Sequence, residues 1–173
     1  MENTLVKKTQ NLTAQETIDK LMEFIKSDSL SFFCTKLTHQ PVTTRPMSTQ
    51  KVDEHGNIWF MSSNKSHKNA EILHNNEVQL FYSNPSNYEF LSVSGNASVH
   101  YERSLIHEMW TPFAEAWFEN GKDDADISVI KISPSSGYYN ATKGNKMISM
   151  IKTLASTITG TAPEGWAPAT LKV

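Results

Sequence analysis

Cysteine and glycine are both scarce in this sequence, and each scarcity excludes a class of protein. Cys34 is the single cysteine among 173 residues, so the chain can form no internal disulfide framework, and one thiol fits a reducing, cytoplasmic setting. The seven glycines form neither a Gly-x-Gly-x-x-Gly nor a Gly-x-x-x-x-Gly-Lys-Ser/Thr pattern. The usual dinucleotide-binding and P-loop folds are therefore excluded.

Long apolar runs and an excess of charge of one sign are also missing. No segment reaches the length of a membrane span, and the first residues lack the apolar stretch of a signal peptide. The formal net charge is −2, whereas proteins that grip nucleic acid usually present a basic face. We expect a cytoplasmic protein that binds neither membrane nor nucleic acid, with one domain over residues 1–173, a core at 14–157 and an irregular tail at 158–173.

The familiar motifs of metal and hydrolytic sites are absent as well. The six histidines have no tight metal-ligand spacing, and Thr111 stands where a zinc-binding His-Glu-x-x-His helix needs its second histidine. No Gly-x-Ser-x-Gly elbow occurs. The Asp123, Asp124 and Asp126 cluster lacks the glycine and the terminal glutamate of a calcium loop, so a solvated acidic turn is expected and no metal site.

What the sequence does contain is a strand-rich pattern with helices at its start, middle and end. Alternating or continuous apolar residues predict strands at 31–37, 42–52, 58–62, 77–82, a long strand through 91–100, and 127–132. Helical spacing predicts helices at 13–27, 66–74, 102–118 and from about 145. The apolar stripe of the segment 102–118 is broken at Pro112 and consists of Leu105, Ile106, Met109, Trp110, Phe113 and Trp117. The predicted fold is mainly β (α+β), a six-stranded and mostly antiparallel closed or nearly closed β-barrel with flanking helices.

Local details of this barrel follow from single residues. Thr13 and Glu16 predict a capping box, Gly56 a positive φ in a hairpin turn, and Asn75-Asn76 a left-handed helix cap. Pro46 lacks a ladder donor, so it belongs at a strand edge or a bulge. Gly95 permits close approach of a backbone, a ligand or another subunit, with internal packing the commonest cause.

The stretch from Arg45 to Lys68 predicts a phosphate site. Arg45 leaves one expected strand, and Ser66 and Lys68 lie at the start of a helix. Two cations, a hydroxyl and the N–H groups of a helix start suit a phosphate dianion. Lysines near a helix N-terminus oppose the dipole unless an anion binds there, although a charged turn that only faces water is the alternative. Trp110 and Trp117 are either core residues or an aromatic wall for a ring-shaped ligand.

The order and spacing of several motifs resemble the general stress proteins related to pyridoxamine 5′-phosphate oxidase. These motifs are Arg45-Pro46-Met47, Asp53 to Gly56, Ile58-Trp59-Phe60, Ser66-x-Lys68, Val93-Ser94-Gly95-x-Ala97, Leu105 to Trp110, Trp117-Phe118 and Gly121-Lys122-Asp123-Asp124. Together they cover roughly residues 14–157. The resemblance implies a split β-barrel, bound FMN in preference to FAD, and a homodimer with the flavin at the interface.

Carried over position by position, the resemblance assigns cofactor-binding roles to Arg45, Pro46, Met47, Met61, Ser62, Ser66, His67, Lys68 and Tyr139. Arg45 and Lys68 would hold the phosphate. His67 replaces an arginine of the oxidases, Gln50 replaces a lysine, and Tyr139 replaces a tryptophan. The Arg-x-His that binds the pyridoxal substrate has no counterpart, so oxidation of pyridoxamine phosphate is not expected.

By this resemblance the chain is an FMN-dependent oxidoreductase or stress protein of unknown substrate, with no catalytic acid or base that the sequence identifies. One alternative is a module that holds FMN, FAD, haem or a related ligand for storage or sensing without turnover. A second alternative is a barrel that has lost its cofactor and persists as a structural dimer, which the departures at Gln50, His67 and Tyr139 would allow.

Overall fold

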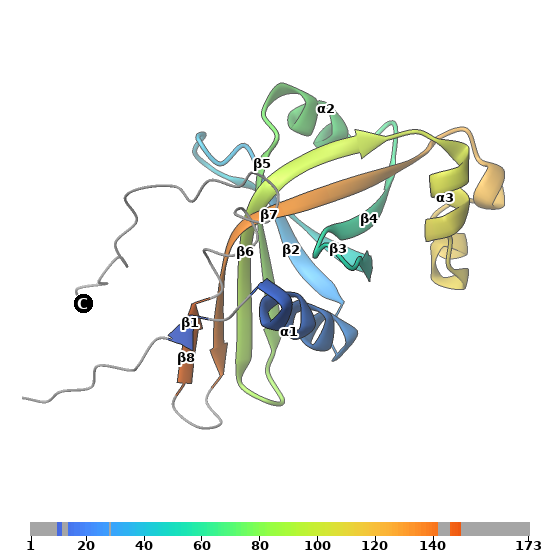
Figure 1. Cartoon of the computed structure of the whole chain (residues 1–173). Helices are drawn as coiled ribbons and strands as arrows, with labels where there is room; N and C mark the ends of the chain where they lie inside the picture. The colour runs from blue at the N-terminus through green and yellow to red at the C-terminus, as the bar shows by residue number, and fades with distance from the viewer. Residues whose placement is uncertain (1–9, 12–13, 28, 142–145, 150–173) are drawn as a thin grey trace, which may run out of the picture.

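A closed β-barrel forms the centre of the molecule. The structure, a computed structural model, describes residues 10–11, 14–27, 29–141 and 146–149. Six antiparallel strands follow the order β7-β4-β3-β2-β5-β6, and pairing of β6 with β7 closes the ring (Figure 1). They are β2 (Leu30–Thr35), β3 (Thr43–Val52), β4 (Ile58–Ser63), β5 (Glu77–Asn84), β6 (Glu89–His100) and β7 (Ile127–Ala141). The predicted six-stranded barrel is confirmed.

Helices flank this barrel, and a short parallel strand pair extends it. The helices are α1 (Ala14–Ser27), α2 (His67–His74) and α3 (Arg103–Met109), with 3₁₀ turns η1 (Pro112–Ala116) and η2 (Gly121–Asp123). Beyond β7, β1 (Gln10–Asn11) pairs with β8 (Lys146–Ser149). Figure 1 shows α2 and α1 near opposite ends of the barrel, and α3 where β6 finishes and β7 begins.

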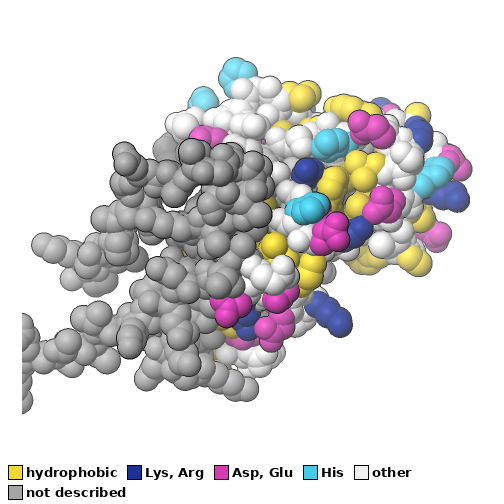
Figure 2. Space-filling model, viewed as in Figure 1, with side chains coloured by type: hydrophobic (Ala, Val, Ile, Leu, Met, Phe, Trp, Pro, Cys, Tyr) yellow, Lys and Arg dark blue, Asp and Glu magenta, His cyan; other side chains and the backbone are white. Residues whose placement is uncertain are grey.

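The main core lies between α1 and the inner face of the barrel. Helical spacing places Ile18, Leu21 and Ile25 of α1 on one buried face, as predicted. Strand alternation turns Leu91 and Val93 of β6 inward, into the same hydrophobic cluster as α1, while Ser92 between them faces outward. On the face shown in Figure 2, charged side chains of both signs are interspersed with hydrophobic ones.

Two irregular strand positions have local physical causes. A Cβ at Gly95 would lie 2.6 Å from the carbonyl oxygen of Ser133, and the β6–β7 register shifts between Ser94 and Gly95 opposite Pro134. Close backbone packing is therefore the reason for glycine here. Pro46 lies in the part of β3 that pairs with β2 before pairing with β4 begins at Thr49, so it occupies a strand edge as predicted.

Several local predictions are confirmed and others are wrong. Gly56 has a φ of 79°, as expected of the hairpin turn. Asn75 has an extended φ of −143° in place of a left-handed cap, because its side chain accepts a hydrogen bond from the Glu77 N–H. The segment 102–118 breaks at Pro112 into α3 and η1.

In the described ranges, no helix combines the length and hydrophobicity needed to cross a bilayer.

The helix expected from about residue 145 is wrong over Lys146–Ser149, which form β8. These residues pair with β7, whose free edge offers backbone partners that helical spacing in the sequence does not reveal. The rest of that expected helix, the irregular tail at 158–173, and Thr13 of the predicted capping box lie outside the described residues.

Candidate functional site

A cavity of about 430 Å³ opens between the barrel wall and the η1 segment. Strands β3 and β4 supply one side and η1 the other, while α2 contributes a single lysine. The lining residues are Leu30, Pro46, Met47, Ser48, Gln50, Met61, Ser62, Ser63, Lys68, Phe113, Ala114, Trp117 and Phe118. Four residues of the predicted site, Pro46, Met47, Met61 and Ser62, therefore lie together with Lys68 as expected.

Most of the cavity wall is apolar. Met47 and Met61 line the barrel side, and Phe113 and Trp117 of the η1 segment line the other. Phe113 is 58% exposed and Trp117 73% exposed, so both present aromatic surface that the other described residues leave uncovered. The two tryptophans have different roles, since Trp110 packs against Phe118 in a separate hydrophobic cluster. Of the two tryptophans, Trp117 therefore lines the cavity and Trp110 does not.

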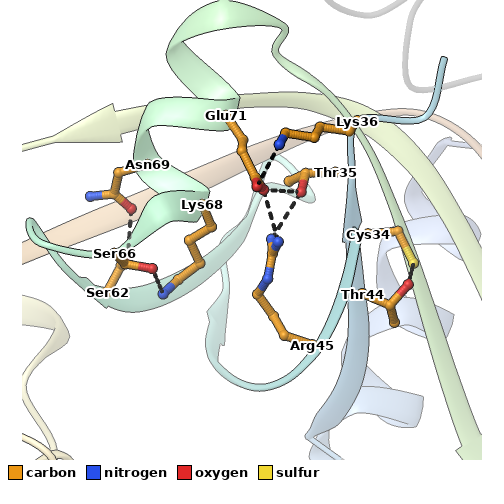
Figure 3. Close-up of polar contacts among 10 residues, drawn as sticks. All are labelled: Cys34, Thr35, Lys36, Thr44, Arg45, Ser62, Ser66, Lys68, Asn69 and Glu71. Atoms are coloured by element: carbon orange, nitrogen blue, oxygen red, sulfur yellow. Dashed lines mark hydrogen bonds and ion pairs between the residues drawn. The ribbon is translucent and has the colours of Figure 1, made fainter. Parts of the chain in front are cut away.

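Lys68 places one positive charge at the edge of this apolar space. Its ammonium donates a hydrogen bond of 2.8 Å to the Ser66 hydroxyl, and within the described residues it forms no ion pair with a carboxylate (Figure 3). Burial and, to a smaller extent, the nearby Arg45 charge lower the pKa of Lys68 to about 8, whereas Glu71 opposes the change. A bound anion would relieve this cost of burying the charge.

Arg45 is held away from the cavity lining by a carboxylate. Its guanidinium donates to Glu71 at 2.8 Å and to the Thr35 hydroxyl at 3.0 Å, and Lys36 lies 3.3 Å from the same carboxylate (Figure 3). Thr35 also donates to Glu71 at 2.5 Å. Burial opposes ionisation of Glu71, but these hydrogen bonds and charges outweigh it, so its pKa lies below the ordinary value.

The floor of the cavity is fixed by a buried chain of hydrogen bonds. Ser62 donates to the Asn69 side-chain oxygen at 2.8 Å, and the Asn69 amide donates to Ser128 at 2.9 Å. Ser128 in turn donates to the Ser62 carbonyl at 3.2 Å. All three side chains are buried. This closed network locks α2 to β4 and β7, which sets the position of Lys68 one residue before Asn69.

Besides Arg45, three predicted site residues do not line the cavity. Ser66 reaches it only through its hydrogen bond with Lys68, and His67 faces a different hollow on the other side of α2. Tyr139 is 2% exposed, packs edge-on against Phe24 at 6.0 Å, and donates to Glu89 at 2.6 Å. Within this chain, Tyr139 is therefore a core residue, distant from the lining of the cavity.

Sequence reasoning missed Glu71, the residue that organises the cations. Its signal was present, because Glu71 follows Lys68 by three residues on the predicted helix, and such pairs are neighbours on a helix surface. Its partner Arg45 lies 26 residues earlier in the chain, and no local pattern predicts that contact. Phe113 was identified only as part of an apolar stripe, since its exposure at the cavity depends on the break at Pro112.

Known proteins are similar to this chain in sequence or in fold. It is 24% identical over 155 residues to protein bli-3 of Neurospora crassa, covering 84% of this chain and 74% of that protein. A Clostridium acetobutylicum protein related to general stress protein 26 gives a TM-score of 0.67 at 18% identity, covering 79% of this chain and 95% of that one. The general stress FMN/FAD binding protein of Xanthomonas citri gives 0.64 at 21% identity, covering 91% and 96%.

The sequence also matches the family model described as pyridoxamine 5′-phosphate oxidase like, over residues 16–164. That range contains the whole barrel, the cavity lining and the Arg45–Glu71 pair. The resemblance identified from the ordered motifs is confirmed, and the chain belongs to the pyridoxamine 5′-phosphate oxidase-like family.

Proposed function

We propose that this protein binds FMN non-covalently in the cavity and acts as a flavin-dependent oxidoreductase or stress protein. The observation that carries the proposal is the combination of an apolar cavity with one half-buried lysine that has no carboxylate partner among the described residues. FMN has the matching chemistry, a large ring system and a dianionic phosphate. The descriptions of similar proteins as general stress and FMN/FAD binding proteins support it.

The residues present fit this ligand. Lys68 and Ser66 would hold the phosphate. Arg45 would add positive charge nearby while its guanidinium stays paired with the Glu71 carboxylate. Met47, Met61 and Trp117 would flank the ring, because thioether and aromatic groups pack well against flat π-systems. When bound, the flavin supplies the electron transfer, whereas the protein binds and orients it.

A second copy of the chain completes the proposed site. The cross-strand row Pro46–Phe32–Phe81 continues through Ser92 to Tyr138, and Phe32 and Phe81 are 58% and 46% exposed. Exposed apolar rows of this kind mark interfaces. Because Leu30 and Pro46 belong to both this face and the cavity lining, a partner on the face would also reach the cavity. The proposed assembly is therefore a homodimer in the cytoplasm, the location that the single thiol favours.

One observation favours a binding protein without turnover as the second candidate. Among the residues that the structure describes, the cavity lining contains no histidine, cysteine, aspartate or glutamate, and Lys68 is its one titratable residue. General acid–base chemistry would then depend on Lys68, on the substrate or on the partner copy. A storage or sensing role for the flavin needs no such group.

The visible absorption spectrum of the purified protein tests this proposal. We expect bound flavin, with its amount reduced about tenfold or more in Lys68→Ala, the loss expected from one charge-assisted contact. Lys65→Ala is the matched control, because Lys65 is exposed and pairs with Asp126 away from the cavity. Bleaching by NADH or NADPH would favour the enzyme over the storage role. A colourless protein that takes up no added FMN would contradict the proposal.

A further inference from the structure

A second hollow, which we call the imidazole groove, lies along the other face of α2. It has a volume of about 500 Å³ and is lined by Lys36, His39, His67, Ala70, Glu71, His74 and Asn75. His67, Glu71 and His74 follow helical spacing and so share one face of α2. Lys36 and His39 come from the turn after β2, where Lys36 has a φ of 54° that non-glycine residues seldom adopt.

The groove begins where the charged end of the cavity stops. His67 and Lys68 are consecutive residues, but Lys68 lines the cavity and His67 lines the groove. Glu71 lines the groove and accepts a hydrogen bond from Arg45. We call Glu71, together with Lys36, Arg45 and Lys68, the wall of the groove. Because His67 and Lys68 are consecutive, the groove and the cavity both begin at the first turn of α2.

The charges of the wall suit a chain of two phosphates. Arg45 and Lys36 contact the Glu71 carboxylate, and Lys68 is close enough to feel the charges of Arg45 and Glu71, so the three cations exceed the single carboxylate by two positive charges. A diphosphate diester carries one negative charge on each phosphate, so the charges balance. The wall therefore has the electrostatic character of a diphosphate site, in addition to that of a single phosphate.

The lining beyond the wall suits a purine. His39, His67 and His74 are exposed, and imidazole rings offer flat faces on which bases stack as well as hydrogen-bonding edges. Asn75 adds an amide that can donate and accept hydrogen bonds. Among the described residues no three His, Cys, Asp or Glu side chains converge in a way that could hold a metal ion, so the histidines do not form a metal site.

We propose that the imidazole groove is a subsite for an adenylate group, supplied either by the flavin itself as FAD or by a separate dinucleotide such as NADH. This inference rests on the proposed flavin site only for the origin of the adenylate. The groove itself, with its histidines and Lys36, lies outside the cavity lining.

The direct test is a titration with AMP, observed through the histidine ring proton resonances of the whole chain. We expect AMP to shift the resonances of His39, His67 and His74 and to leave that of His55 unchanged. A His39→Ala/His74→Ala double variant should lose the response, while His55→Ala, which removes an exposed histidine on the β3–β4 turn, should keep it. Thermal unfolding of each variant separates loss of binding from loss of fold.

Fluorescence titration with FMN and FAD then identifies which molecule supplies the adenylate group. If the adenylate belongs to the flavin, FAD binds about tenfold more tightly than FMN, the gain expected when one base stacks on an aromatic side chain, and the double variant removes that gain. If AMP and NADH compete for the groove while FAD gains nothing, the adenylate belongs to a separate dinucleotide. No AMP response and equal FMN and FAD affinities would overturn the inference. Failure to bind either flavin would contradict the proposed function. The AMP titration would still show whether the groove binds an adenylate group.

Discussion

At the scale of single residues, the two cations of the candidate site have different environments. Lys68 points into the cavity with a hydroxyl as its partner, whereas Arg45 is occupied by the Glu71 carboxylate and the Thr35 hydroxyl. Arg45 therefore contributes to anion binding mainly through the electrostatic potential of its charge. Lys68 is the group available for direct contact with an anion. The buried position of Lys68 also makes that contact dependent on pH.

The first prediction concerns that pH dependence. Because burial lowers the pKa of Lys68 to about 8, the unliganded protein loses this positive charge as the pH rises through 8. A phosphate stabilises the charged form, so its binding takes up a proton in that range. We expect FMN affinity to fall about tenfold between pH 7.5 and pH 9.5, measured by fluorescence titration. Lys68→Arg should bind with little change over the same range, because guanidinium stays charged. Equal pH profiles for wild type and Lys68→Arg would contradict this role.

A second prediction concerns Glu71, whose side chain is 10% exposed. Its pKa lies below the ordinary value of 4.5, so its contribution to stability is present above that pH and is lost as the pH falls below it. Glu71→Gln should lower the free energy of unfolding at pH 7 by about 2 kcal/mol, since hydrogen bonds to a charged group are lost. It should also strengthen binding of inorganic phosphate, because Arg45 and Lys36 lose their counter-ion.

Urea unfolding at pH 7 and pH 3.5 measures the stability difference between wild type and Glu71→Gln, which should shrink at the lower pH. Glu77→Gln serves as the control, since Glu77 is an exposed carboxylate at the start of β5. A difference that is unchanged between the two pH values would show that the Glu71 charge does not stabilise the fold.

At the scale of elements, the long β6–β7 pair and the broken α3–η1 segment position the cavity. The register shift beside Gly95 lets both long strands continue, so that β6 leads into α3 at one end of the barrel. The break at Pro112 then turns η1 back over β3 and β4, where Phe113 lines the cavity. The chain thus builds one wall of the site from a segment that helical spacing alone would have extended as a single helix.

A third prediction follows from this close strand contact. Gly95→Ala places a Cβ 2.6 Å from the Ser133 carbonyl oxygen, so one of the two backbones must move. We expect a loss of about 1–3 kcal/mol in the free energy of unfolding, which is the usual cost of overpacking. The melting temperature measured by circular dichroism should fall, whereas Asn96→Ala on the exposed face of β6 should have little effect. An unchanged melting temperature in Gly95→Ala would contradict this prediction, because β7 would then move away from the added Cβ without a loss of stability.

At the scale of the whole molecule, the outer face of the barrel is the unusual surface. Phe32, Phe81, Phe90 and Tyr138 surround a shallow hollow of about 140 Å³ on the outside of the sheet. Three of them are among the exposed large hydrophobic residues. Water-facing aromatic clusters of this kind are unfavourable in a monomer, which is the physical reason for the proposed dimer.

The fourth prediction tests that assembly. Phe32→Glu should convert the protein from a dimer to a monomer of 19.5 kDa, because a buried, unpaired carboxylate would oppose the contact. Light scattering coupled to size-exclusion chromatography measures the mass. Leu73→Glu is the matched control, since Leu73 is a 71% exposed hydrophobic residue on α2, apart from this face. A wild-type protein that is monomeric at micromolar concentration would contradict the proposed assembly.

Local patterns in the sequence were sufficient for most of the barrel. Strand alternation, the Gly56 turn and the amphipathic α1 each depend on neighbours close in the chain, and the structure confirms them. The cations of the candidate site were also identifiable, because Arg45 and Lys68 stand next to expected strand and helix boundaries.

Contacts between distant residues were decided by the tertiary structure. The pairing of Arg45 with Glu71, the lowered pKa of Lys68 and the burial of Tyr139 all depend on which side chains the barrel brings together. The strand at Lys146–Ser149 likewise forms because β7 offers a free edge, although its sequence has helical spacing. Sequence by itself therefore determined the elements and the family of this protein, whereas burial and charge neighbourhood, which are properties of the assembled fold, determined which cation is available to a ligand.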